Sequence, residues 1–178
     1  MVSAVIEITT NCNIVHQQTA GGVGYGKAFG MKVLAYDPFL TEGRAKALLY
    51  TSNLPSTVER QCLAQSPWVG QYRPLGMRIW SEMDDNNRVI AWKIEGDYLR
   101  DTLTIWMDGR QRPPDYVMHT WSGFNVGEWD GDTLVQTSTH LKEAYIRRWG
   151  PMRSDESTVR IRYKRIGNYL RATIIIYD

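Results

Sequence analysis

Turn-forming residues recur at short intervals over residues 76–178, and each cluster stands between two apolar runs. The clusters are Asp84–Asn87, Asp108–Gly109, Asp130–Asp132 and Gly167–Asn168. Asp, Asn and Gly adopt the backbone conformations that tight turns require, so a cluster of this kind between apolar runs favours a β-hairpin. The short spacing leaves no room for helices between the runs. It predicts seven or more strands, joined as an antiparallel meander with a hairpin turn at each cluster.

The segment VRIRYK at 159–164 alternates apolar and basic side chains. Because successive side chains of a strand point to opposite faces of a sheet, this strand has one buried and one solvated face. A meander of this length twists strongly and tends to close on itself, since closure removes exposed strand edges. We therefore predict that residues 71–178 form a mainly β domain, an antiparallel barrel or strongly curled sheet. Its interior is either packed with side chains or holds one small ligand.

The chain has 178 residues, which is enough for one sizeable core but not for a nucleotide domain and a separate catalytic domain. We interpret residues 1–70 as a short α/β segment that packs outside the β-domain and is not an independent domain. A strand is expected over 31–36 and a helix over 41–50. A second helix is expected over 56–65, where Ser56 and Glu59 have the spacing of a capping box.

Charge and composition argue against several classes of partner. The formal net charge of +2 gives no overall attraction to nucleic acid or to a membrane surface. Cys12 and Cys62 lack the spacing of a metal site. No apolar stretch approaches the ~20 residues of a membrane span. The N-terminal residues lack the basic and apolar regions of an export signal, so a cytoplasmic location is expected.

Residues 21–48, GGVGYGKAFGMKVLAYDPFLTEGRAKAL, resemble the cofactor-binding segment of the D-2-hydroxyacid dehydrogenases, including the phosphoglycerate dehydrogenases. The resemblance implies a Gly-rich turn that opens a helix, followed by a strand that ends at Asp37, placed to hold the ribose of NAD. The glycines of this segment do not fit G-x-G-x-x-G in any register, and most of the following helix is missing. Without that helix there is no N-terminal anion site for the pyrophosphate, so NAD is not expected to bind.

Three later segments follow one another in a specific order: IWMDGR at 105–110, HTWSGFNVGEWDGDTLVQTSTHLK at 119–142 and IRRWGPMRSDE at 146–156. Together they are similar to a family of small, β-rich bacterial proteins that are mostly secreted. The resemblance implies a β-rich fold and carries no activity with it. Arg112 stands where that family often has a histidine, which argues against a metal or acid–base role for its loop.

His140 follows Gln136 and Ser138 at a period of two, so the three side chains are expected on one face of a strand. If this polar row faces the interior, the barrel has a wet and reactive lumen. If it faces solvent, His140 is an ordinary surface histidine. His119 is expected either to pack against aromatic residues or to lie near His140 in a pocket.

The pattern favours a small hydrolase, in which a histidine and a carboxylate activate water against an ester or a lactone, including an acyl lactone. No G-x-S-x-G motif is present, so attack by water is favoured over an acyl-enzyme. The alternative is a non-catalytic carrier of an apolar small molecule, bound among the Trp and Tyr side chains. The expected catalytic residues are His140, His119 and Glu128, and the expected binding residues are Gln136, Ser138, Trp121 and Trp129.

Acidic side chains also flank the turn at Gly131. Asp130 and Asp132 offer the carboxylate oxygens that calcium prefers, but the segment lacks the pattern of a twelve-residue calcium loop. We interpret the pair either as a calcium site or as an ordinary turn. No other cofactor is expected.

Overall fold

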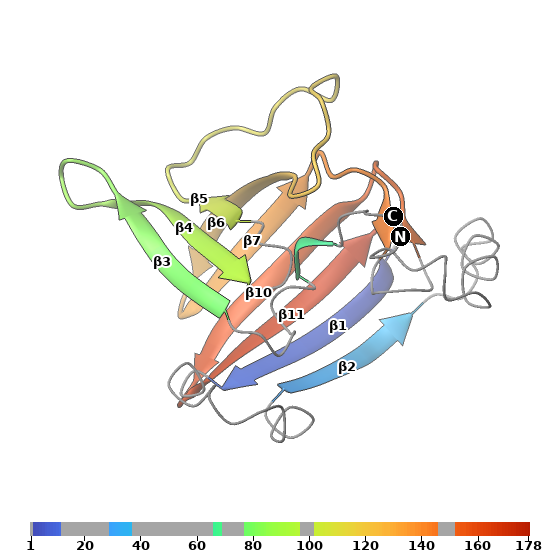
Figure 1. The fold of residues 1–178 in the computed structure, drawn as a ribbon, viewed down its shortest axis with the longest axis horizontal. Coiled ribbons are helices and arrows are strands. Elements are labelled where there is room, and N and C mark those ends of the chain that lie inside the picture. The colour runs from blue at the N-terminus through green and yellow to red at the C-terminus, as the bar shows by residue number, and fades with distance from the viewer. Residues whose placement is uncertain (1, 12–28, 37–65, 69–76, 97–101, 146–151) are drawn as a thin grey trace.

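The computed structural model describes residues 2–11, 29–36, 66–68, 77–96, 102–145 and 152–178 (Figure 1). Most of these residues belong to one nine-stranded sheet of order β2-β1-β11-β10-β7-β6-β5-β4-β3, and β8 and β9 form a separate two-stranded sheet. The strands are β1 (Val2–Asn11), β2 (Phe29–Tyr36), β3 (Met77–Met83), β4 (Val89–Gly96), β5 (Thr102–Trp106), β6 (Phe124–Asp130), β7 (Thr133–Thr139), β8 (Ala144–Tyr145), β9 (Met152–Arg153), β10 (Thr158–Ile166) and β11 (Tyr169–Tyr177).

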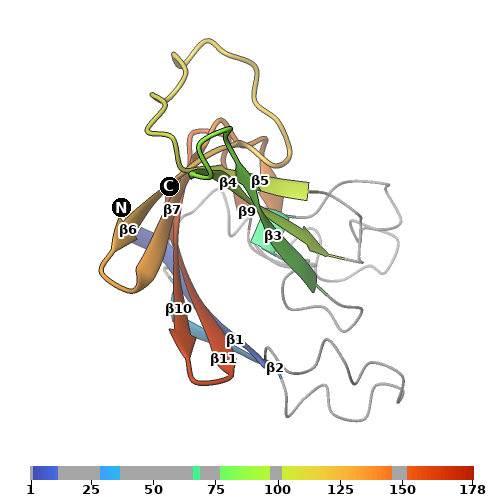
Figure 2. The ribbon, with the colours of Figure 1, turned by 90° about the vertical axis from the view of Figure 1, so that its left-hand side faces the viewer.

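The strands that follow residue 76 curl into a half-barrel, which is clearest when the sheet is seen along its edge (Figure 2). No α-helix occurs among the described residues. The prediction of a mainly β fold with a strongly curled sheet is therefore confirmed. β2 and β3 are the two ends of the strand order, so the sheet is curled and not closed over the part of the chain that the structure describes.

Three of the predicted hairpins are confirmed, and the fourth is wrong. The turns near Asn86, Asp130 and Gly167 each join antiparallel neighbours. Beyond Asp108, however, the chain leaves the sheet, and β5 lies parallel to β6. The reason is visible a few residues on, where Pro113 and Pro114 supply no N–H groups for a returning strand. The sheet is consequently mixed, and the segment 107–123 projects beyond the strands as a long loop (Figure 1).

The core lies on the inside of the curl. Buried apolar side chains from β4, β5, β7, β10 and β11 pack into one cluster with Trp68. The short segment 66–68 lies within the curl of the sheet (Figure 2). The alternation at 159–164 is confirmed, because Val159, Ile161 and Tyr163 are buried while Arg160 is exposed. Burial of these side chains is the main source of stability for such a sheet.

The N-terminal strands belong to the same sheet. The expected strand at 31–36 is confirmed as part of β2, which pairs with β1, and β1 in turn pairs with β11. The expectation that this segment packs outside the β-domain is therefore wrong for β2. The helices expected over 41–50 and 56–65 lie outside the described residues, as does most of the dehydrogenase-like segment. Among the residues described, no helix has the length and apolar character needed to cross a membrane.

Candidate active site

A polar pocket of about 430 Å³ lies where the long loop 107–123 meets the end of β7 and the segment before β10. Its lining comes from three stretches of chain: the loop, the end of β7, and the turn that leads into β10. The lining residues, in that order, are Arg112, Asp115 and His119; Thr139 and His140; and Asp155, Glu156, Ser157 and Thr158. The pocket therefore brings two of the three predicted catalytic residues together, namely His119 and His140.

The loop is fixed to the end of β7 by backbone hydrogen bonds. The Thr120 amide donates to the His140 carbonyl, and the Lys142 amide donates to the Thr120 carbonyl, both at 2.9 Å. Thr120 also forms a parallel bridge with Leu141. These contacts place His119 and His140 side by side, with ring centroids 5.2 Å apart in an edge-to-face arrangement.

Gly123 allows this close approach. A Cβ atom there would lie 2.6 Å from the Leu141 side chain and 2.7 Å from the Thr139 carbonyl oxygen, which is closer than real Cβ contacts. Its backbone also has a positive φ of 68°, a conformation that glycine adopts without steric cost. The loop can therefore lie against the end of β7 only with glycine at this position.

His140 is buried, and both of its ring nitrogens are hydrogen-bonded. Nε2 lies 3.0 Å from the Pro114 carbonyl oxygen, which can only accept, so Nε2 is the donor. The Thr139 hydroxyl is 3.0 Å from Nδ1 and donates to it. The backbone of His140 has a left-handed φ of 54°, which turns the chain out of β7. The imidazole is thus held between the strand and the loop and has no nitrogen left for a substrate.

His119 is partly buried, and only one of its nitrogens is engaged. Nδ1 lies 3.3 Å from the Leu141 carbonyl oxygen and must donate to it. In the neutral ring Nε2 is then an acceptor, and it has no hydrogen-bond partner among the described residues. Of the two histidines, His119 is therefore the one available for proton transfer.

The rest of the lining is charged or hydroxylic. Arg112 forms an ion pair with Asp115, both within the loop. Asp155 and Glu156 are exposed, and neither carboxylate is paired with a cation in the described part of the chain. The net charge of the lining favours a neutral or cationic ligand over an anionic one.

Gln136 and Ser138 do not line this pocket. The Gln136 amide donates to Asn125 Oδ1 at 3.1 Å and to the Ser138 hydroxyl at 2.8 Å, and its carbonyl accepts from the Tyr163 hydroxyl at 3.1 Å. All four residues are buried. The polar row of β7 therefore faces inwards, but the left-handed turn at His140 breaks the period of two and separates the histidine from the other two side chains.

The remaining predicted residues lie elsewhere. Glu128 and Trp129 are exposed on β6, and the Lys142 amine lies 5.2 Å from the centroid of the half-buried Trp121 ring. None of the three lines the pocket that contains the histidines.

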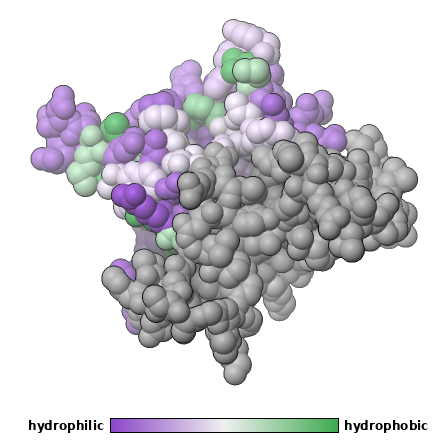
Figure 3. Space-filling model, in the orientation of Figure 1, coloured by the Kyte–Doolittle hydropathy of each residue, from purple (hydrophilic) through white to green (hydrophobic). Residues whose placement is uncertain are grey.

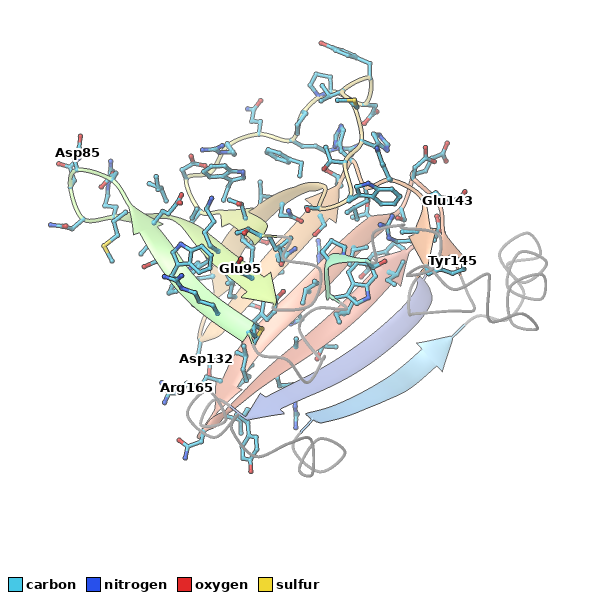
Figure 4. All side chains as sticks on the ribbon, viewed as in Figure 1. Asp85, Glu95, Asp132, Glu143, Tyr145 and Arg165 are labelled. Carbon is cyan, nitrogen blue, oxygen red and sulfur yellow. The ribbon has the colours of Figure 1, made fainter. Side chains whose placement is uncertain are left out.

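Asp130 and Asp132 are engaged by cationic side chains. Asp130 pairs with Arg162 at 2.7 Å and Asp132 with Lys164 at 3.2 Å. The hydrogen bond from Lys164 is the largest cause of the lowered pKa of Asp132. Asp132 lies at the far end of β7 from His140 (Figure 4). No group of three or more candidate metal ligands occurs among the described residues, so calcium binding here stays a prediction without a coordinating geometry.

Sequence reasoning did not identify the third wall of the pocket. Asp155–Thr158 is separated from His140 by β8 and β9, and the sequence favours an ion pair, not a pocket wall, for the polar group that includes Asp155. Arg112 was noticed only as a departure from a family pattern. In comparisons with family models, curated proteins and solved structures, no match was found. The geometry of the pocket is therefore the basis for any functional argument.

Proposed function

We propose that this protein is a small hydrolase that cleaves an ester or a lactone with water activated by His119. The observation that carries the proposal is the hydrogen bond from His119 Nδ1 to the Leu141 carbonyl oxygen, at 3.3 Å. It leaves Nε2 as the free acceptor of a ring that lines a polar pocket. A neutral imidazole with one nitrogen anchored and the other free is suited to general-base catalysis.

The chemical step uses one water molecule. His119 Nε2 takes a proton from the water as its oxygen attacks the carbonyl carbon, and a tetrahedral intermediate forms. When the intermediate collapses, the bond to the leaving oxygen breaks and the imidazolium returns its proton to that oxygen. An ester yields an acid and an alcohol, and a lactone yields one hydroxy acid. Arg112 and Thr158 are the lining donors proposed to stabilise the oxyanion.

His140 has a positioning role in this proposal. Its ring is held by Thr139 and Pro114 and packs against His119, so it fixes the orientation of the base and offers the substrate no free ring nitrogen. The polar lining supports hydrolysis over the carriage of an apolar molecule, because a carrier gains little from charged walls. The loop adds apolar contact area, since Tyr116 and Met118, next to the lining residues Asp115 and His119, are 88% and 80% exposed. Figure 3 shows a small hydrophobic patch at the top of the molecule, where this loop projects.

The test is a hydrolysis assay of the purified chain on short- and medium-chain nitrophenyl esters and on acyl lactones. His119→Gln should lower kcat/KM by roughly 10²- to 10⁴-fold while the protein stays folded. Glu128→Gln is the matched control, because Glu128 is exposed on β6 away from the pocket, and its activity should equal that of the wild type.

Two results would overturn the proposal. One is turnover that survives in His119→Gln. The other is tight binding of these compounds by the wild type without any turnover, which would establish the carrier function instead.

A further inference from the structure

Arg153 is buried without the hydrogen bonds that its guanidinium requires. The side chain is 1% exposed, although it carries a positive charge. Nη1 donates to the Ser154 carbonyl oxygen at 3.2 Å and to the Ser157 hydroxyl at 3.3 Å. Nε and Nη2 have no hydrogen-bond partner in the described part of the chain. Buried polar atoms in folded proteins are nearly always paired, so these two donors call for an explanation.

The two unpaired atoms have a shared geometry. Nε and Nη2 lie on the same edge of the planar guanidinium group, and their N–H bonds point in nearly the same direction. This edge matches the two oxygens of a carboxylate or a phosphate, which it binds through a pair of parallel hydrogen bonds. The donors that remain free are therefore the pair best suited to an oxyanion.

The surroundings of Arg153 favour an anionic partner. Burial lowers the pKa of Arg153 to about 10, so the group is still charged at neutral pH. The guanidinium carbon lies 5.7 Å from the centroid of the buried Trp68 ring, and β9 pairs with β8, which contains the buried Tyr145 (Figure 4). A cation among such side chains is costly unless an opposite charge is bound close to it.

The nearest acidic residues do not supply that charge. Asp178, Asp155 and Glu143 oppose the lowering of the Arg153 pKa through their charge alone, and no hydrogen bond joins them to Nε or Nη2. The Asp178 carboxylate accepts instead from the amide of Ser154, at 2.8 Å, and from its hydroxyl. Among the described residues, therefore, none pairs with this edge of the guanidinium.

We propose that the Nε–Nη2 edge of Arg153 binds an oxyanion that presents two oxygens, a carboxylate or a phosphate group of a small molecule. The site is separate from the His119 base and does not depend on the proposed hydrolysis. The two are adjacent through Ser157, which accepts from Arg153 and also lines the histidine pocket.

The experiment measures anion binding by the full chain, using calorimetry and thermal unfolding in sodium phosphate, sodium acetate and sodium chloride at equal ionic strength. Phosphate or acetate should raise the Tm above its value in chloride, because two oxygens accept one N–H bond each, a geometry that a single chloride ion matches less well. A stronger response to phosphate would identify a phosphate-bearing ligand, and a stronger response to acetate a carboxylate.

Variants test the edge itself. Arg153→Met should remove the anion response, and Arg153→Lys, which keeps the charge but loses the paired donors, should weaken binding by roughly tenfold or more. Arg160→Met, at an exposed position on β10, is the matched control and should respond like the wild type. A wild-type Tm that is equal in the three salts would overturn the proposal, and so would an Arg153→Lys protein that binds as tightly as the wild type.

Discussion

Gln136 and Arg153 are both long polar side chains that are 1% exposed, yet their hydrogen bonding is opposite. Every polar atom of the Gln136 amide is used, because its nitrogen donates to Asn125 and Ser138 and its oxygen accepts from Tyr163. Arg153 uses Nη1 and leaves Nε and Nη2 without partners in the described part of the chain.

The difference shows that burial of a polar group does not by itself indicate a functional site. A network whose donors and acceptors all match is self-sufficient and stabilises the core. A buried donor pair without acceptors lacks a partner that the described part of the chain does not provide. Gln136 on β7 is therefore a structural polar group, whereas Arg153 on β9 is the group for which we propose a ligand.

The largest effect is expected from Gln136→Ala. The substitution leaves a cavity and removes the partner of three buried polar groups, so the free energy of unfolding should fall by roughly 3 kcal/mol. Urea unfolding at neutral pH measures the change. In chloride buffer, Arg153→Met should cost far less, because it removes a buried charge whose Nε and Nη2 have no hydrogen-bond partner among the described residues. The comparison fails if the arginine variant proves the more destabilised of the two.

A smaller loss is expected from Tyr163→Phe, which removes one hydroxyl from the same network. Gln136 Oε1 then loses the donor that lies 3.1 Å away, while the packing of the ring is kept. The free energy of unfolding should fall by about 1 kcal/mol. If Tyr163→Phe is as stable as the wild type in urea, the network is not the matched set of bonds that the comparison assumes.

The sequence predicted the sheet well where one turn determines the pairing. Gly131 and Gly167 have positive φ values of 61° and 58°, and each stands between strands that pair directly. The dipeptide Asp108–Gly109 has the same local chemistry and a φ of 74° at Gly109, but it begins a crossover. Local turn preference cannot distinguish a hairpin from a crossover. The difference depends on the prolines that follow the turn and on which strand the next strand pairs with.

The candidate site was predicted only in part, for a related reason. His119 was expected either to pack against aromatic residues or to lie near His140. The two histidines lie together because the loop and the end of β7 are joined at Thr120. The expectation that Gln136 and Ser138 accompany His140 depended on a regular strand. The left-handed backbone at His140 ends that regularity, and sequence alternation carries no sign of it. Arg153 was not singled out, since burial without partners is a tertiary property.

The smallest effect is expected at an exposed ion pair, which completes the comparison with the two buried groups. Arg110 donates to Asp108 and packs over the Trp106 ring, with its guanidinium carbon 3.4 Å from the ring centroid. The hydrogen bonds from the Arg110 side chain are the main cause that lowers the pKa of Asp108 from 3.8 to about 2. Solvent screens this pair, so Asp108→Asn should cost less than about 1 kcal/mol at neutral pH.

The pH dependence of that cost has a definite sign. The pKa of Asp108 is lower in the folded chain than in the unfolded chain, so its stabilisation is complete above the unfolded value of 3.8 and is lost as the pH falls towards 2. Urea unfolding of the wild type and Asp108→Asn should therefore differ most at neutral pH and converge below pH 4. Asp85→Asn, at the exposed tip of the β3–β4 hairpin (Figure 4), is the control for the loss of an exposed turn carboxylate. A constant difference across this range would mean that Asp108 acts through turn geometry and not through its charge.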